Sequence, residues 1–227
     1  MPSLLRQIQS INEYAYNYCI GVNFEHYIIG RDQFQHLSRW ISDASKLSGC
    51  ARVFLRVANE RLFLSIYYHH SIIKNLENND PRNGLSEQNI TAFIIFIEEI
   101  NHAFHAALKF KEGRTQNIIS EQGIRDLELL SKIDTYLLLK YFVARFNESN
   151  QLENLDRLWI KYHLFERQDF DYENAHISQR YYEASYLGER YIRFLDALPI
   201  VERKDELTRF RQLPYADKSD YIRMLPC

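Results

Sequence analysis

The chain has 227 residues, enough for one large domain or two small ones, and 46% apolar with 26% charged residues is ordinary for a globular protein. A formal net charge of −2 excludes the basic excess that drives sequence-independent binding to nucleic acid. Three distant cysteines exclude a disulfide framework or a zinc ribbon. The N-terminal segment lacks the apolar core of a signal peptide, and no run is apolar enough for a membrane span, so we expect a cytoplasmic protein without a membrane partner.

The first third of the chain predicts two helices and a hairpin. Apolar residues recur at helical spacing up to about Cys19 and again over 32–47, where Asp32 can cap the helix and Gly49 can end it. Over 51–68, apolar residues alternate with others on both sides of a turn at 58–61, and β-branched and aromatic residues are frequent. This pattern predicts a β-hairpin, with a single helix over 51–76 as the alternative.

The remainder of the chain predicts helices separated by clear breaks. Loop or turn sequences occupy 78–84 and 147–151, and prolines stand at 199 and 214. Between them the expected helices are 86–111, 120–146, 152–166, 174–198, 204–213 and 216–225. The sequence therefore predicts a mainly α, bundle-like single domain over 1–227 with one small hairpin insert, and 147–152 is the best internal boundary.

The stretch IEEINHAFH places carboxylates and imidazoles in an otherwise apolar helix. Glu99-x-x-His102 has the i, i+3 spacing of carboxylate-bridged metal bundles, with Glu128 and Asp134 available on the next helix. These four residues could form a ferritin-like iron, manganese or zinc site, but the second E-x-x-H motif is missing. Glu128 and Asp134 also stand about 240° apart around their helix. The favoured interpretation is a buried network in which His102 bonds a carboxylate of the neighbouring helix, without a cofactor.

The order of the segments over about 50–225 resembles a group of bacterial proteins of unassigned function. In this group an E-E-x-x-H helix is followed by an L-E-L-x-x-x-x-D helix; here the motif residues are Glu98, Glu99, His102, Glu128 and Asp134. Leu130 and Lys132 stand where the pattern has Gln and Glu. The resemblance implies the hairpin and the pairing of the two helices, but no reaction.

A second alternative is RNA cleavage, since helical nucleases of the HEPN type carry Arg-x4–6-His. Arg31 to His36 and Arg157 to His163 both fit this loose pattern. Chance matches are expected in a chain with 28 Lys and Arg and 8 His. There is no glycine-rich phosphate loop and no GxSxG elbow, so the sequence favours a non-catalytic protein.

The expected helix over 174–198 is rich in tyrosine and arginine, which are enriched among the residues that dominate protein interfaces. Tyrosine rings packed at the edge of a core, with their hydroxyls outward, explain many of them. The leading hypothesis is an accessory or regulatory protein that binds another protein, with nucleic acid disfavoured. The candidate partner-binding residues are Arg180, Tyr181, Tyr182, Tyr186, Arg190 and Arg193.

Overall fold

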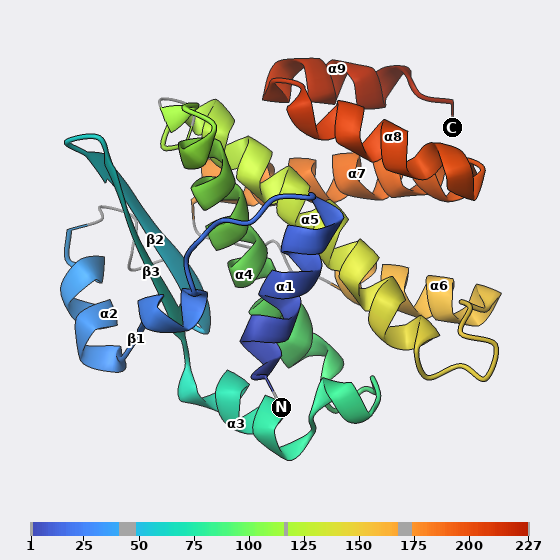
Figure 1. Ribbon diagram of the computed structural model, residues 1–227, viewed down its shortest axis with the longest axis horizontal. Helices are drawn as coiled ribbons and strands as arrows, with labels where there is room; N and C mark the ends of the chain where they lie inside the picture. Colours follow the sequence, from blue (N-terminus) through green and yellow to red (C-terminus); the bar gives the residue numbers. More distant parts are fainter. Residues whose placement is uncertain (1, 41–48, 116–117, 168–173, 227) are drawn as a thin grey trace.

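The computed structural model describes residues 2–40, 49–115, 118–167 and 174–226. This part of the chain holds nine α-helices and one small three-stranded sheet, which confirms a mainly α fold with a small β insert (Figure 1). The α-helices are α1 (Leu4–Ala15), α2 (Arg31–Ser38), α3 (His70–Asn78), α4 (Ile90–Lys111), α5 (Glu121–Ala144), α6 (Asn154–Lys161), α7 (Ala175–Ala197), α8 (Ile200–Gln212) and α9 (Tyr215–Met224). The other elements are the strands β1 (Ile28–Ile29), β2 (Ala51–Ala58) and β3 (Arg61–Tyr68), the 3-10 helices η1 (Phe24–Tyr27) and η2 (Pro81–Asn83), and the π-helical turn η4 (Tyr162–Glu166).

The predicted hairpin is present, and the alternative of one helix over 51–76 is wrong. β2 and β3 pair antiparallel in register from Ala51–Tyr68 to Ala58–Arg61. Asn59 and Glu60 form the two-residue loop with φ of 50° and 55°, the left-handed conformation that a type I′ turn requires.

Two neighbouring elements are not predicted from the sequence. β1 pairs parallel with β3 through only two residues, too few to show any periodicity. α3 follows the hairpin at once, where His69 acts as its N-cap and accepts a hydrogen bond from the Ser71 amide.

Most of the long helices begin and end close to the expected residues, and capping side chains or prolines mark these ends. Ser120 accepts from the Gly123 amide at the start of α5, and Asn174 accepts from two amides at the start of α7. α4 begins at Ile90 rather than near Ser86, and α8 begins at Ile200, directly after the proline that ends α7. α2 ends at Ser38; residues 41–47 of the helix expected over 32–47 lie outside the described part of the chain.

The arrangement places α4 at the centre of the molecule. α4 packs against the sheet, α1 and α3, and against α5, which in turn packs against α7; α9 contacts both α5 and α7 (Figure 1). α4 is apolar around nearly its whole circumference, and Phe93, Ile97 and Phe104 are completely buried. Polar side chains on such a helix need partners on its neighbours. No helix in the described residues is long and apolar enough to cross a membrane.

Candidate functional site

The side chains of Glu99, His102 and Glu128 meet between α4 and α5, and we call them the His102 cluster. His102 Nε2 lies 3.2 Å from Glu128 Oε2, and His102 Nδ1 lies 3.9 Å from Glu99 Oε2. The ring and Glu128 form an ion pair without the alignment of a good hydrogen bond. The Glu99-x-x-His102 pair thus faces α5 as expected, with Glu128 as the partner of the ring.

Burial and neighbouring charges set the protonation of this cluster. Burial alone would lower the pKa of His102, but the carboxylates of Glu128 and Glu99 outweigh it and raise the pKa to about 9. Burial raises the pKa of Glu99 to about 7 against the opposing charge of His102. Burial also acts to raise the pKa of Glu128, but the His102 charge outweighs it and the pKa is lowered. At neutral pH His102 is therefore a cation beside the Glu128 carboxylate, while Glu99 is only partly ionised.

Further polar contacts extend along the same helix interface. Lys132 on α5 pairs with Glu98 at 2.5 Å, so the first glutamate of the motif also has an α5 partner. Asn101 donates to Thr135 Oγ1 at 3.0 Å and accepts from Asn12 of α1 at 2.8 Å. The polar residues of α4 thus join α1 and α5, and such directional contacts specify how helices pair.

Asp134 belongs to a separate group, the Asp134 cluster, which comprises Tyr16, His105, Asp134 and Arg211. Asp134 Oδ2 lies 3.0 Å from His105 Nε2 and accepts from the Tyr16 hydroxyl at 2.6 Å, while Oδ1 accepts from Arg211 at 2.6 Å. Burial opposes ionisation, but Arg211 and the other donors outweigh it and hold the pKa of Asp134 far below its usual value. The angular offset between Glu128 and Asp134 explains why the four proposed metal ligands do not converge.

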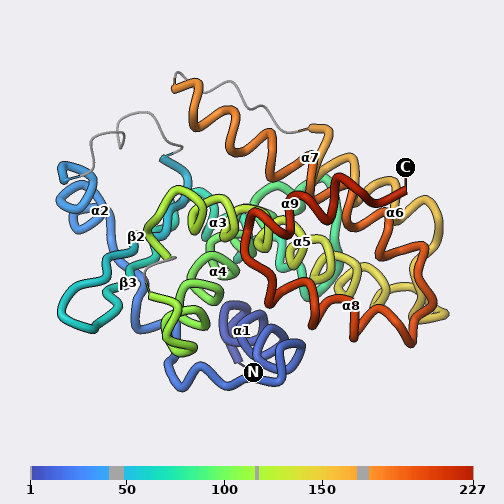
Figure 2. Tube along the Cα trace, turned by 90° about the horizontal axis from the view of Figure 1, so that it is seen from above, coloured from blue at the N-terminus to red at the C-terminus, as the bar shows by residue number. Residues whose placement is uncertain are grey.

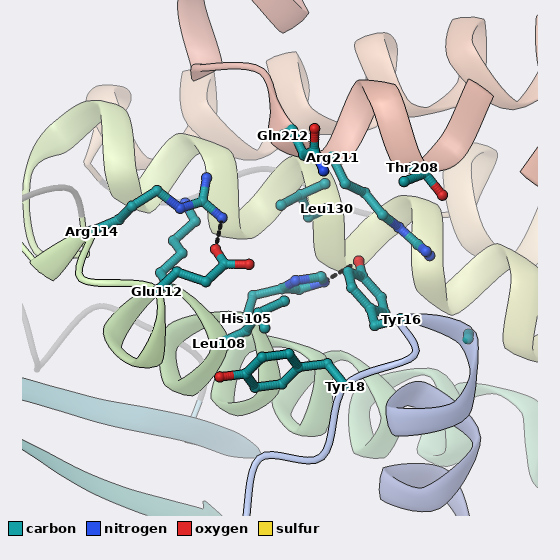
Figure 3. Close-up of a pocket in the computed structure, with 12 residues that line it drawn as sticks. Tyr16, Tyr18, His105, Leu108, Glu112, Arg114, Leu130, Thr208, Arg211 and Gln212 are labelled. Carbon is teal, nitrogen blue, oxygen red and sulfur yellow. Dashed lines mark hydrogen bonds and ion pairs between the residues drawn. The ribbon is translucent and has the colours of Figure 1, made fainter. Parts of the chain in front are cut away.

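The Asp134 cluster borders a pocket between α1, α4, α5 and α8 (Figure 3). Its volume is about 110 Å³. The lining residues are Ala15, Tyr16, Tyr18, His105, Leu108, Lys109, Glu112, Arg114, Leu130, Thr208, Arg211 and Gln212. In Figure 3, His105 lies between Glu112 and Arg114 on one side and Tyr16 and Arg211 on the other. Sequence reasoning missed this pocket, because its walls come from segments far apart in the chain.

The proposed partner-binding residues on α7 divide into two groups. Tyr182 and Tyr186 are 62% and 49% exposed, and the Arg193 side chain is 66% exposed. Arg190 instead donates to main-chain carbonyls at the end of α9, including that of Ile222 at 2.9 Å.

Arg180 and Tyr181 also lie away from the outer face of α7. Arg180 is largely covered and lies 3.8 Å from Glu121 of α5, and Tyr181 is partly buried. The outward-facing subset of the six is therefore Tyr182, Tyr186 and Arg193.

The geometry offers little support for the two alternatives, a metal site and an RNase. Within the described ranges, no group of three or more His, Cys, Asp and Glu side chains is arranged to hold a metal ion. His163 bonds Glu87 at 2.8 Å, whereas Arg157 lies 3.5 Å from Asp196. The two residues of the nuclease-like motif therefore contact different carboxylates. His36 lies on the exposed helix α2 and its ring lies near that of Trp40.

Comparison of the chain with protein-family models, with curated proteins and with solved structures found no match.

Proposed function

We propose that this chain is a non-catalytic binding protein whose docking face is the outer side of α7. We define this α7 face as Tyr182, Tyr186 and Arg193. The observation that carries the proposal is the exposure of two tyrosine rings one helical turn apart, with an exposed arginine further along the same side. Tyrosine and arginine are the residue types that most often dominate the energy of protein interfaces.

The α7 face is held on a rigid support. Glu183 of α7 pairs with Arg125 of α5 and, at 3.0 Å, with Arg223 of α9. Gly188 allows close packing against α5, because a Cβ atom there would lie 3.3 Å from Lys132 Cβ. A preorganised helix loses little conformational entropy on binding, which favours affinity. Figure 2 shows the N-terminal half of α7 along an outer edge of the molecule, where a partner protein can reach it.

The internal polar clusters support a binding role in a second way. The charged groups of the His102 cluster pair with one another, those of the Asp134 cluster do the same, and together the two clusters join helices α1, α4, α5 and α8. Side chains paired inside the protein in this way stabilise the arrangement of the helices. We therefore assign the recognition of a partner to surface residues.

Site-specific photo-crosslinking tests the proposal. A photoreactive residue replaces Tyr182 or Tyr186 in cells of the native host, and crosslinked proteins are identified by mass spectrometry. The matched control is the same residue at Tyr14 of α1, a tyrosine that is 89% exposed. The crosslinking is then repeated with the purified partner.

We expect one protein to crosslink from both α7 positions and not from position 14, in cells and with purified components. Equal crosslinking from position 14, or crosslinks in cells that purified components do not reproduce, would refute the proposed docking face.

A further inference from the structure

We propose that the pocket beside the Asp134 cluster binds a small oxyanion, a compact ligand that carries a carboxylate or phosphate group. The proposal is independent of the α7 face, since the pocket is lined by residues of α1, α4, α5 and α8 and of the segments that follow α1 and α4.

Arg211 is the first reason. Its guanidinium lies over the Tyr16 ring, 3.7 Å from the centroid, and donates through one terminal nitrogen to Asp134. Its Nε is buried and has no hydrogen-bond partner among the described residues. A planar guanidinium fixed by stacking, with a donor unused, is suited to a carboxylate or phosphate, which accept hydrogen bonds from the fork-like edge of arginine. A bound oxyanion would satisfy a buried donor that otherwise destabilises the fold.

The charge balance around the pocket is the second reason. Lys109 in the wall and Lys218 behind it share a single carboxylate, Asp126, at 2.5 Å and 2.7 Å. One carboxylate therefore faces two ammonium groups. Burial lowers the pKa of Lys218 to about 8, although the charge of Asp126 opposes this.

The other two charged pairs at the pocket are balanced. Arg211 pairs with Asp134, and Arg114 pairs with Glu112. Together with Lys109, Lys218 and Asp126, these pairs contain four basic side chains and three carboxylates. The remaining positive charge favours an anion.

The size of the pocket limits the ligand. A volume of about 110 Å³ corresponds to several water molecules, since one water occupies roughly 10–15 Å³ by this measure. An inorganic phosphate or a short dicarboxylate fits such a space, whereas a nucleotide does not. The Arg114–Glu112 pair is about one-third exposed, so Arg114 can reach an entering ligand from solvent.

The test is a titration of the full chain with inorganic phosphate and, separately, with succinate, each compared with sodium chloride at equal ionic strength. Two-dimensional NMR of amide and histidine-ring signals follows binding. The variants are Arg114→Gln, which changes a partly exposed residue, and Arg211→Gln. The matched control is Arg209→Gln. Arg209 lies on α8, as Arg211 does, but it pairs with Glu206 and does not line the pocket.

We expect at least one of the two anions to give saturable shifts centred on His105 and its neighbours. Binding should be about tenfold weaker in Arg114→Gln, through loss of one charge-assisted hydrogen bond, and unchanged in Arg209→Gln. Arg211→Gln should abolish binding while the signals of a folded protein remain.

Shifts that do not saturate for either anion at tens of millimolar would overturn the proposal. So would equal weakening in Arg114→Gln and Arg209→Gln, because the shifts would then report general charge screening.

Discussion

The protonated state of His102 makes stability depend on pH in a direction that can be measured. Its pKa is raised from 6.5 to about 9 by the carboxylates of the His102 cluster. A raised pKa means that the folded state holds the proton more tightly than the unfolded state. The resulting stabilisation is fully present below pH 6.5 and is lost as the pH rises through about 9. Glu99, whose pKa is raised from 4.5 to about 7, acts in the same direction at lower pH.

The size of the effect follows from the difference in pKa. The rise from 6.5 to about 9 corresponds to an upper bound of ~3.5 kcal/mol, because one pKa unit is ~1.4 kcal/mol. His102 and Glu99 interact with each other, so their contributions do not simply add. We therefore expect the wild-type protein to lose about 2–3 kcal/mol of unfolding free energy between pH 6.5 and 9.5 through His102.

Urea unfolding at several pH values, together with NMR titration of the His102 ring, measures this effect. His102→Gln removes the titrating group and should lose much less stability between pH 8 and 9.5 than the wild type. His36→Gln, a change at an exposed position of α2, is the matched control and should behave as the wild type does. A His102 ring that titrates below pH 6.5, or equal losses in wild type and His102→Gln, would refute the reasoning.

Three further substitutions test other parts of the structure by urea or thermal unfolding. Asp134→Asn leaves Arg211 without its carboxylate and should destabilise the fold by about 3–5 kcal/mol; a loss below 1 kcal/mol would show that the pair is not buried as described. Arg190→Met removes the donors to the end of α9 and should cost about 1–3 kcal/mol, with faster amide exchange in α9 as the specific readout. Glu60→Gly should stabilise the hairpin by about 0.5–1 kcal/mol, because glycine suits the left-handed loop position; destabilisation would contradict the type I′ assignment.

Local patterns in the sequence predict most of the fold. Alternation and a short turn locate the hairpin, and the caps at Ser120 and Asn174 locate α5 and α7. β1 is missed because its partner, β3, lies far along the chain and two residues carry no pattern. α3 is missed because it follows the hairpin without a break: His69, the residue directly after β3, is already its N-cap.

The sites are predicted less completely, because they depend on contacts between distant segments. Spacing within α4 predicts that Glu99 and His102 share a face, and Glu128 is the partner found there. Nothing local indicates that Tyr16 and Arg211 meet at Asp134, since they lie near opposite ends of the chain.

On α7, the spacing of residues along the helix predicts which side chains are exposed better than residue type does. Arg180 stands about 160° around the helix from Tyr182, whereas Tyr186 and Arg193 stand within about 40° of it. The exposures of these side chains follow that geometry. A count of tyrosines and arginines cannot separate the outer face from the residues that fix α7 to its neighbours.

The affinity of the crosslinked partner for α7 variants is the most direct measurement of the central claim. Calorimetry with purified proteins should show binding weakened at least about 30-fold by Tyr182→Ala combined with Tyr186→Ala, as expected for loss of interface hot spots. Tyr14→Ala should leave the affinity unchanged. Wild-type affinity in the double variant, with the protein still folded, would contradict the assignment of the docking face to α7.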